Sequence, residues 1–377
     1  MVFNLRTFSF SSADEDDPTP PRNFSLKELR DATNRFSHGN IVGGGDFGAV
    51  YRGRLADGSL VAVKRAVTID QERKEFFERE MQVASSVSLH PNVLNLRGFC
   101  RAKRELLLVY PLMIHNSLAS NLGERRDRST GPLDWTTRKR IALGAARGLA
   151  HLHNQGNIRI MHRHICPYSI LLNAQFEAVI AGFCAAVIMH ERNVQEGTTK
   201  NRVEDSVASD SGSQAYNCYD YVYDDNFIYG VGGFIAPEYR YTGKCTLKID
   251  VFAFGRTLLE LVSGQGTGDL FLLRFGKHII LEGRTDGGTI KNELKTLIDP
   301  ELQGKYPEEE AEGLVQLALL CTHDDPSVRP EMSQVIRMLE TQLLGQDPSS
   351  RSSRSLSEHD STPYYSFPPS PSSKAAP

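Results

Sequence analysis

The sequence predicts an α+β protein in which a small β-rich lobe precedes a larger helical lobe. Residues 41–63 alternate β-forming residues with glycines and contain an Asp-Gly turn signal, a pattern typical of strands joined by tight turns. From Pro132 onward, apolar residues recur at helical spacing. In the first such helix they are Ile141, Ala145, Leu149 and Leu152. The chain has 377 residues, enough for two lobes that each bury a core.

The remaining elements follow from caps and periodicity. Ser25 and Glu28 form a predicted capping box, and the helix that they begin is expected to end near Phe36. Further helices are expected at 74–87, 246–262, 311–321 and 331–343, and strands at 93–99 and 105–110. The predicted units are a disordered acidic, proline-containing tail at 1–22, a helix-bearing segment at 23–40, the β-rich lobe at 41–114, the helical lobe at 115–343, and a disordered serine- and proline-rich tail at 344–377.

Composition excludes several classes of protein. The chain has 43 Lys plus Arg against 46 Asp plus Glu and a net charge of -3, so no basic excess indicates a nucleic-acid partner. Six cysteines occur without a CxxC pair, which favours reduced thiols in the cytosol. The longest apolar run, Leu106 to Ile114, is too short to span a membrane. We therefore expect a cytoplasmic protein, with recruitment to the plasma membrane through a partner as an option.

A glycine-rich motif and a lysine indicate a phosphate cradle. The motif GxGxxGxV is formed by Gly43, Gly45, Gly48 and Val50. Missing side chains let backbone amides approach phosphates, and the valine would cover the base. Lys64 ends the run Val-Ala-Val-Lys and can reach phosphates, while Glu80 in the next helix can hold the lysine by an ion pair. An ordinary glycine-rich hairpin and a solvated surface lysine are the alternatives.

Longer runs identify a family. They are RLADGSLVAVKR at 54–65, LRGFC at 96–100, LLVYP at 107–111, RIALGAARGLAHLH at 140–153, APE at 236–238, DVFAFG at 250–255 and DPSVRP at 325–330. Over residues 24–343 the sequence resembles the plant receptor-like protein kinases close to the somatic-embryogenesis receptor kinases. The resemblance implies the bilobal eukaryotic protein-kinase fold.

The resemblance also implies roles for individual residues. The nucleotide-binding positions would be Gly43, Gly45, Gly48, Val50, Ala62, Lys64, Glu80, Met113 and Leu171. Glu238 would pair with Arg329 beneath the activation segment, and Asp250 would brace the catalytic loop. An apolar spine joining the lobes would contain His162, Phe183, Ala84 and Leu96. Ordinary core packing is the alternative for the spine residues, and it is the favoured one.

The family's catalytic residues are missing. In its HRDxKxxN loop the Asp, Lys and Asn are replaced by His164, Cys166 and Ser169, and the metal-binding Asp of its DFG motif is replaced by Gly182. These groups orient the substrate hydroxyl, balance phosphate charge and hold magnesium. We therefore predict a pseudokinase, with weak ATP binding and no tightly bound Mg²⁺, acting with active receptor-like kinases or other signalling proteins.

Other interpretations remain open. The chain could be an active, divergent Ser/Thr kinase that uses His164 or a water-held metal, or a product with no selected role. His162, His164 and Cys166 alternate along one loop and could bind zinc, although no fourth ligand is evident. The acids of the stretch at 194–228 could mimic a phosphate for Arg163. Alternatively, its tyrosines could bind a partner or be phosphorylated by an active receptor kinase, or the stretch could be a passive loop.

Overall fold

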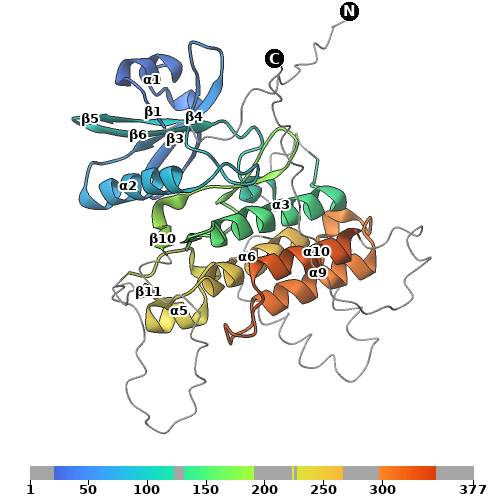
Figure 1. The fold of residues 1–377 in the computed structure, drawn as a ribbon. Coiled ribbons are helices and arrows are strands. Elements are labelled where there is room, and N and C mark those ends of the chain that lie inside the picture. The colour runs from blue at the N-terminus through green and yellow to red at the C-terminus, as the bar shows by residue number, and fades with distance from the viewer. Residues whose placement is uncertain (1–20, 123–130, 191–222, 225–226, 266–296, 345–377) are drawn as a thin grey trace, which may run out of the picture.

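The computed structural model describes residues 21–122, 131–190, 223–224, 227–265 and 297–344. A β-rich lobe lies above a helical lobe, as predicted (Figure 1). The first lobe contains the strands β1 (Arg22–Asn23), β2 (Ile41–Gly44), β3 (Gly48–Arg54), β4 (Leu60–Ala66), β5 (Gly98–Ala102) and β6 (Glu105–Pro111) and the helices α1 (Leu26–Ala32), η1 (His38–Asn40) and α2 (Gln71–Ser86). The α+β class is confirmed.

The six strands form one sheet in the order β1-β5-β6-β4-β3-β2. All neighbours are antiparallel except β1, which pairs parallel to β5. In Figure 1, α1 lies above this sheet and α2 below it. The register sets Val50 opposite Lys64, so the valine of the glycine-rich motif and the lysine lie on adjacent strands.

Two local predictions in this lobe were only partly correct. Ser25 caps α1, because its Oγ accepts a hydrogen bond from the Glu28 amide at 3.1 Å. The Glu28 carboxylate pairs with Arg22 at 2.9 Å instead of completing the capping box. The helix ends at Ala32 rather than near Phe36, since residues 34–36 adopt left-handed φ values of 51°, 54° and 56° and cannot continue a right-handed helix.

The strand expected at 93–99 begins only at Gly98. Residues before it turn toward the helical lobe, where the Leu94 amide donates to the Ile180 carbonyl at 2.8 Å and the Asn92 side chain donates to the Ala178 carbonyl at 2.8 Å. The apolar run therefore connects the two lobes, a role that periodicity alone does not distinguish from a strand.

The N-terminal segment builds a second core on the outer face of the sheet. Phe24, Leu29 and Phe36 belong to one buried cluster with residues of β3, β4 and β6. Arg22, which the sequence analysis places in the tail, lies in β1, and the Phe24 amide donates to the Phe99 carbonyl at 2.7 Å. Gly98 permits this docking, because a Cβ there would lie 2.2 Å from the Arg22 carbonyl oxygen.

We expect Gly98→Ala to displace the segment at 22–24 from the sheet. Overpacking of this kind costs about 1–3 kcal/mol of the free energy of unfolding. Chemical denaturation measures the loss, and limited proteolysis detects release of the segment. Gly39→Ala is the matched control, because its Cβ would meet nothing closer than 4.0 Å. Equal stability of the two variants would contradict the docking role of Gly98.

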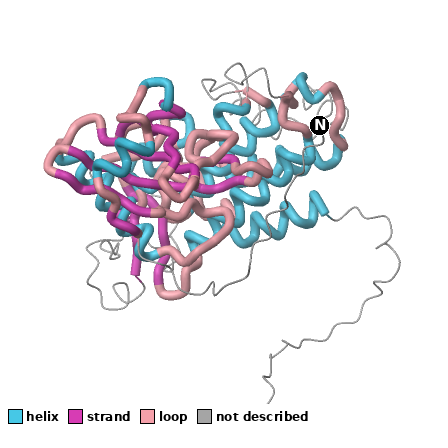
Figure 2. Tube along the Cα trace, turned by 90° about the horizontal axis from the view of Figure 1, so that it is seen from above, coloured by secondary structure: helices cyan, strands magenta, loops and turns pink. Residues whose placement is uncertain are grey.

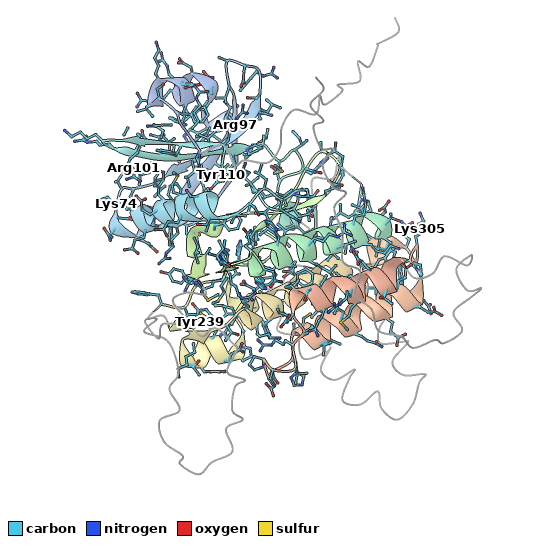
Figure 3. The ribbon with its side chains drawn as sticks, viewed as in Figure 1. Lys74, Arg97, Arg101, Tyr110, Tyr239 and Lys305 are labelled. Atoms are coloured by element: carbon cyan, nitrogen blue, oxygen red, sulfur yellow. The ribbon has the colours of Figure 1, made fainter. Side chains whose placement is uncertain are left out.

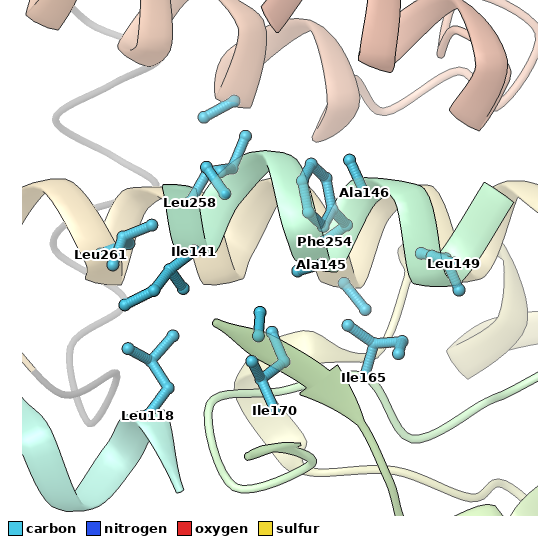
Figure 4. Close-up of a cluster of buried hydrophobic side chains, with 14 of the residues drawn as sticks. Leu118, Ile141, Ala145, Ala146, Leu149, Ile165, Ile170, Phe254, Leu258 and Leu261 are labelled. Atoms are coloured by element: carbon cyan, nitrogen blue, oxygen red, sulfur yellow. The ribbon is translucent and has the colours of Figure 1, made fainter. Parts of the chain in front are cut away.

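The second lobe is built around α6 (Lys248–Ser263), almost all of whose residues are buried. The other helices are η2 (Leu118–Asn121), α3 (Trp135–His153), η4 (Phe183–Ala185), η5 (Gly232–Phe234), α5 (Pro237–Thr242), η6 (Pro300–Leu302), α9 (Glu308–Cys321) and α10 (Met332–Leu344). Figure 2, a view from above, shows its long helices lying side by side, with α6 against α9 and α3 against α10. Figure 4 shows the core between α3 and α6, where Ile141 and Ala145 face Leu258 and Phe254.

Short strands carry the loops at the junction of the lobes. β7 (Ile158–Met161) pairs with β10 (Val187–His190), and β8 (Ile170–Leu172) pairs with β9 (Ala178–Ile180). β11 (Tyr223–Asp224) pairs with β12 (Lys244–Cys245). Apart from β11 and residues 227–228, the predicted insert at 194–228 lies outside the described residues, as do the tails beyond 21 and 344. In the described part of the chain, no helix is long and apolar enough to cross a membrane.

Candidate nucleotide cleft and catalytic loop

Lys64 in β4 and Glu80 in α2 form an ion pair between the sheet and the helix. Lys64 Nζ lies 3.0 Å from Glu80 Oε1, and the side chains are 18% and 2% exposed. Burial lowers the pKa of Lys64 most strongly, but the charge and hydrogen bond of Glu80 act in the opposite direction and leave it raised. The lysine is therefore held as a cation where the resemblance expects phosphates.

Tyr110 at the end of β6 completes this arrangement (Figure 3). Its hydroxyl donates to Glu80 Oε2 at 2.6 Å, so both carboxylate oxygens of Glu80 have a partner. Burial and the Glu80 charge raise the pKa of Tyr110 well above its usual value and keep it a neutral donor. Tyr110 was not among the site residues predicted from the sequence. The run LLVYP that contains it was noted only as a family signature, because nothing in it specifies a partner in α2.

The glycine-rich loop lies over this pair. The Gly45 amide donates to the Gly48 carbonyl at 3.1 Å, which closes the loop between β2 and β3. Gly48 must lack a side chain, because a Cβ would lie 1.9 Å from the Arg65 carbonyl oxygen. Gly43 lies in β2 opposite Val50. These glycines thus allow close backbone packing in the structure, and their contact with phosphates stays a prediction.

The four apolar positions expected around the base lie on three elements and the connection that follows β6. Val50 and Ala62 are half-buried on β3 and β4. Met113 and Leu171 are half-buried members of one apolar cluster with Tyr110. The register sets Ala62 of β4 opposite both Arg52 and Tyr110. Base binding by these residues stays a prediction.

Asp250 in α6 holds the catalytic loop from below. Its carboxylate accepts from the amides of His162 at 2.7 Å and Arg163 at 2.8 Å, and lies 3.0 Å from His153 Nε2. Burial favours its neutral form, but the His153 hydrogen bond and charge outweigh it and lower the pKa of Asp250. Arg163 is held at a left-handed φ of 62°, a strained conformation that these two amide bonds impose.

His162 packs in the spine that the resemblance implies. Its ring lies 5.2 Å from the Phe183 ring, and Phe183 lines one small cavity with Ala84 and Leu96. Because the Ala181 carbonyl can only accept, His162 Nε2 carries the proton in their 3.1 Å hydrogen bond, and Nδ1 accepts from the His164 amide. Burial lowers the pKa of His162 to about 4, so the ring is neutral.

The two metal-binding positions of the family lie side by side, and neither offers a charged ligand. A Cβ on Gly182 would lie 3.9 Å from Ser169 Cβ. The Ser169 hydroxyl donates to the Cys166 carbonyl at 3.0 Å and accepts from the Cys166 amide at 3.0 Å. Cys166 itself is buried, which raises the pKa of its thiol. The Ser169 hydroxyl is thus already hydrogen-bonded within this turn, at the position where the family has the amide side chain of asparagine.

These residues do not fit a magnesium ion. Gly182 has no carboxylate, and Mg²⁺ requires hard oxygen ligands in octahedral geometry. Within the described ranges, no group of three His, Cys, Asp or Glu side chains could hold a metal. Both ring nitrogens of His162, one of the three residues of the zinc alternative, make hydrogen bonds in this structure.

Two further positions concern the activation segment. Arg329 lies beneath α5 and pairs with Glu238 through both guanidinium nitrogens, at 2.6 and 2.8 Å, as the resemblance implies. Arg163 Nε donates to the Ala185 carbonyl at 2.6 Å, and its guanidinium lies 4.6 Å from the centre of the Tyr229 ring. The Tyr239 hydroxyl, in α5 (Figure 3), accepts from the Tyr229 amide at 3.0 Å. Tyr229 was not singled out from sequence.

Comparison with known proteins identifies the family. The model of the protein kinase domain matches residues 36–361. The chain belongs to the protein kinase family. It is 39% identical over 327 residues to a probable LRR receptor-like serine/threonine-protein kinase of Arabidopsis thaliana, covering 86% of this chain and 48% of that protein. It is 38% identical over 328 residues to the LRR receptor kinase SERK2 of Oryza sativa subsp. japonica, covering 86% and 49%. The chain spans about half the length of these relatives.

The kinase fold of this chain thus retains its supporting contacts and lacks charge at its metal positions. Lys64–Glu80, Asp250 with the loop amides, and Glu238–Arg329 are all formed. The carboxylates that resemblance expects at 164 and 182 are absent from the sequence. The contacts that shape the domain are therefore present, whereas the carboxylates that serve phosphoryl transfer in the family are absent.

Buried His162 makes the stability of this kinase domain depend on acid. Its pKa is about 4 in the fold, against 6.5 ordinarily, so the unfolded chain binds a proton first as the pH falls. We expect up to about 3 kcal/mol of the free energy of unfolding to be lost between these two values. Burial also lowers the pKa of His90 and His164, which adds loss of the same sign.

Urea denaturation of the wild type and of His162→Phe at about pH 7 and about pH 4.5 isolates this contribution. The variant keeps a ring against Phe183 but cannot titrate, so it should lose less stability on acidification. The hydrogen bonds that the variant loses lower the free energy of unfolding by the same amount at both pH values. Parallel pH dependence of the two proteins would show that His162 does not titrate as described.

Proposed function

We propose that this chain is a pseudokinase, a protein kinase domain that does not transfer phosphate and acts as a scaffold or regulator in receptor-like kinase signalling. The observation that carries this proposal is the adjacency of Gly182 and Ser169, with no carboxylate at either position and the serine hydroxyl bonded to Cys166. Phosphoryl transfer depends mostly on positioning and charge neutralisation by metal. Loss of both ligands removes the main source of rate enhancement.

Nucleotide binding in this proposal is weak and indifferent to Mg²⁺. Lys64 is held as a cation by Glu80, so one positive group remains for phosphates. Without protein ligands the divalent ion adds no anchor of its own. ATP is therefore a permitted ligand, and a tightly bound Mg²⁺ is not expected.

The proposed partners are active receptor-like kinases, and the proposed location is the cytoplasm, with recruitment to the plasma membrane by a partner. Similarity to receptor-like kinases supports this choice of partner class. The ion pair between Arg329 and Glu238 is formed, and this supports a role as a scaffold, which depends on the shape of the domain and not on catalysis. No nucleic-acid partner is proposed, because the net charge is -3.

An active, divergent Ser/Thr kinase is the alternative, and one observation favours it. Burial lowers the pKa of His164, so its imidazole is neutral and able to accept a proton from a substrate hydroxyl. A neutral base does not replace the missing metal ligands, however. An active kinase would therefore have to transfer the phosphoryl group with little help from a metal ion.

Phosphotransfer distinguishes the two functions. We expect the purified chain to incorporate no more labelled phosphate, into itself or into a generic protein substrate, than Lys64→Ala, because both lack a complete catalytic centre. The His164→Ala variant tests the proposed base in the same assay. Incorporation that exceeds the Lys64→Ala background and is lost in His164→Ala would establish the active alternative.

Restoring the metal ligands should restore magnesium dependence. In Gly182→Asp with Ser169→Asn, we expect ATP to bind at least about tenfold more tightly with Mg²⁺ than without it, because carboxylate and amide oxygens suit this ion. The Cβ position at Gly182 is open, and aspartate tolerates its left-handed φ of 83° better than most residues.

Thermal shift at several ATP concentrations measures this effect. Gly182→Ala with Ser169→Asn is the matched control, since it changes the backbone in the same way without adding a carboxylate. A wild-type protein that already binds ATP much more tightly with Mg²⁺ would contradict the proposed indifference to the ion. An equal gain in the alanine control would show that the carboxylate is not responsible.

A further inference from the structure

The tip of the glycine-rich loop turns into the cleft instead of toward solvent. Phe47, the apolar residue of this tip, is only 1% exposed, although loop tips ordinarily lie at the surface. It belongs to the buried cluster that contains Phe76 of α2 and Tyr110 of β6. The ring is thus part of the core between the sheet and α2.

The Phe47 ring lies against the amine that would meet phosphates. Lys64 Nζ is 5.2 Å from the ring centre, within the range of a cation–π interaction. Glu80 holds the same amine at 3.0 Å. Lys64 therefore already has a carboxylate partner and an aromatic partner, both supplied by this chain.

Backbone contacts hold the tip in this position. The Arg73 guanidinium Nε in α2 donates to the Asp46 carbonyl at 3.1 Å, and the Val67 amide after β4 donates to the Phe47 carbonyl at 3.1 Å. At the base of the loop, Gly48 pairs with Ala66 of β4 and packs so closely that a Cβ would lie 1.9 Å from the Arg65 carbonyl oxygen. The two residues of the tip are thus tied to α2 and to β4.

The same tip brings negative charge to the cleft. Burial is the main influence on the pKa values of Lys64 and His164 and lowers both, and the Asp46 carboxylate acts in the opposite direction on each. The Asp46 side chain itself is exposed, and its charge opposes that of an incoming triphosphate. A triphosphate at Lys64 would have to displace the buried ring.

We propose that Phe47 fills the phosphate part of the cleft, so that the site selects adenosine-like nucleosides or flat heteroaromatic ligands without phosphates over ATP. The proposal rests on the proposed function, since it concerns the ligand of the same cleft. Val50 and Ala62 are half-buried on β3 and β4, and Met113 and Leu171 are half-buried against the cluster that contains Phe47, so these four side chains are the candidates for contact with a planar base. A neutral nucleoside needs neither metal nor Lys64.

Calorimetric titration of the full chain with adenosine and with ATP, both without Mg²⁺, tests the proposal. The wild type should bind adenosine at least as tightly as ATP. Phe47→Ala should bind ATP at least about tenfold more tightly than the wild type, about 1.4 kcal/mol, and should change adenosine affinity less than about threefold. The gain should vanish when Lys64→Ala is added, because phosphates then find no amine.

Phe47→Leu guards against failure to fold, since it keeps an apolar side chain and should give a smaller gain for ATP. Val67→Ala is the matched control at an exposed neighbour, 72% exposed, and should change neither affinity. Circular dichroism and thermal unfolding establish that each protein is folded. An ATP gain that persists in the Lys64→Ala background would show general loosening of the lobe and overturn the proposal.

Three other outcomes would also overturn it. They are a wild type that prefers ATP to adenosine, equal gains for both ligands in Phe47→Ala, and folded Phe47 variants that bind neither ligand at millimolar concentration. A phosphotransfer assay on the same samples keeps the two hypotheses separate. Transfer by Phe47→Ala would remove the pseudokinase function and leave the Phe47 proposal standing, whereas loss of the ATP gain without transfer would remove only the latter.

Discussion

The junction of the lobes depends on the hydrogen bonds that the buried carboxylate of Asp250 accepts from the catalytic loop. This carboxylate accepts hydrogen bonds from two consecutive amides, at His162 and Arg163, and so stabilises a loop in which Arg163 has a left-handed φ of 62°. Hydrogen bonds to a charged group contribute about 2 kcal/mol each, and removal of the carboxylate would leave both amides buried and unpaired. The position of His162 against Phe183, and hence the contact between loop and spine, follows from this one acceptor.

The framework and the chemistry of a kinase are separable because different physical terms support them. Asp250, the Arg329–Glu238 pair and the Phe183 packing stabilise the fold through burial and paired charge. A metal-binding carboxylate at position 182 would contribute charge to a cleft and little to packing, since a side chain there touches almost nothing. The absence of a carboxylate at this position therefore costs the fold little.

Closure of the cleft uses the same parts as the fold of the first lobe. The core beneath the sheet includes Phe47, and the core above it is completed by Phe24 and Leu29 from the N-terminal segment. Each side of the sheet thus receives apolar side chains from residues that precede β3 in the chain. A loop tip packed in the core gains apolar burial of the kind that stabilises the lobe, and the proposed ligand preference rests on competition between this burial and an incoming phosphate.

The sequence by itself determined the two-lobe order, most helices and the family, because periodicity and the motif around Lys64 are local patterns. It also determined that carboxylates are absent at 164 and 182. Tertiary structure alone decided that Glu28 pairs with Arg22, that Tyr110 completes the Glu80 pair, and that Phe47 lies on Lys64. These contacts join residues far apart or choose between two available partners, and such choices depend on how whole elements pack, which no local pattern encodes.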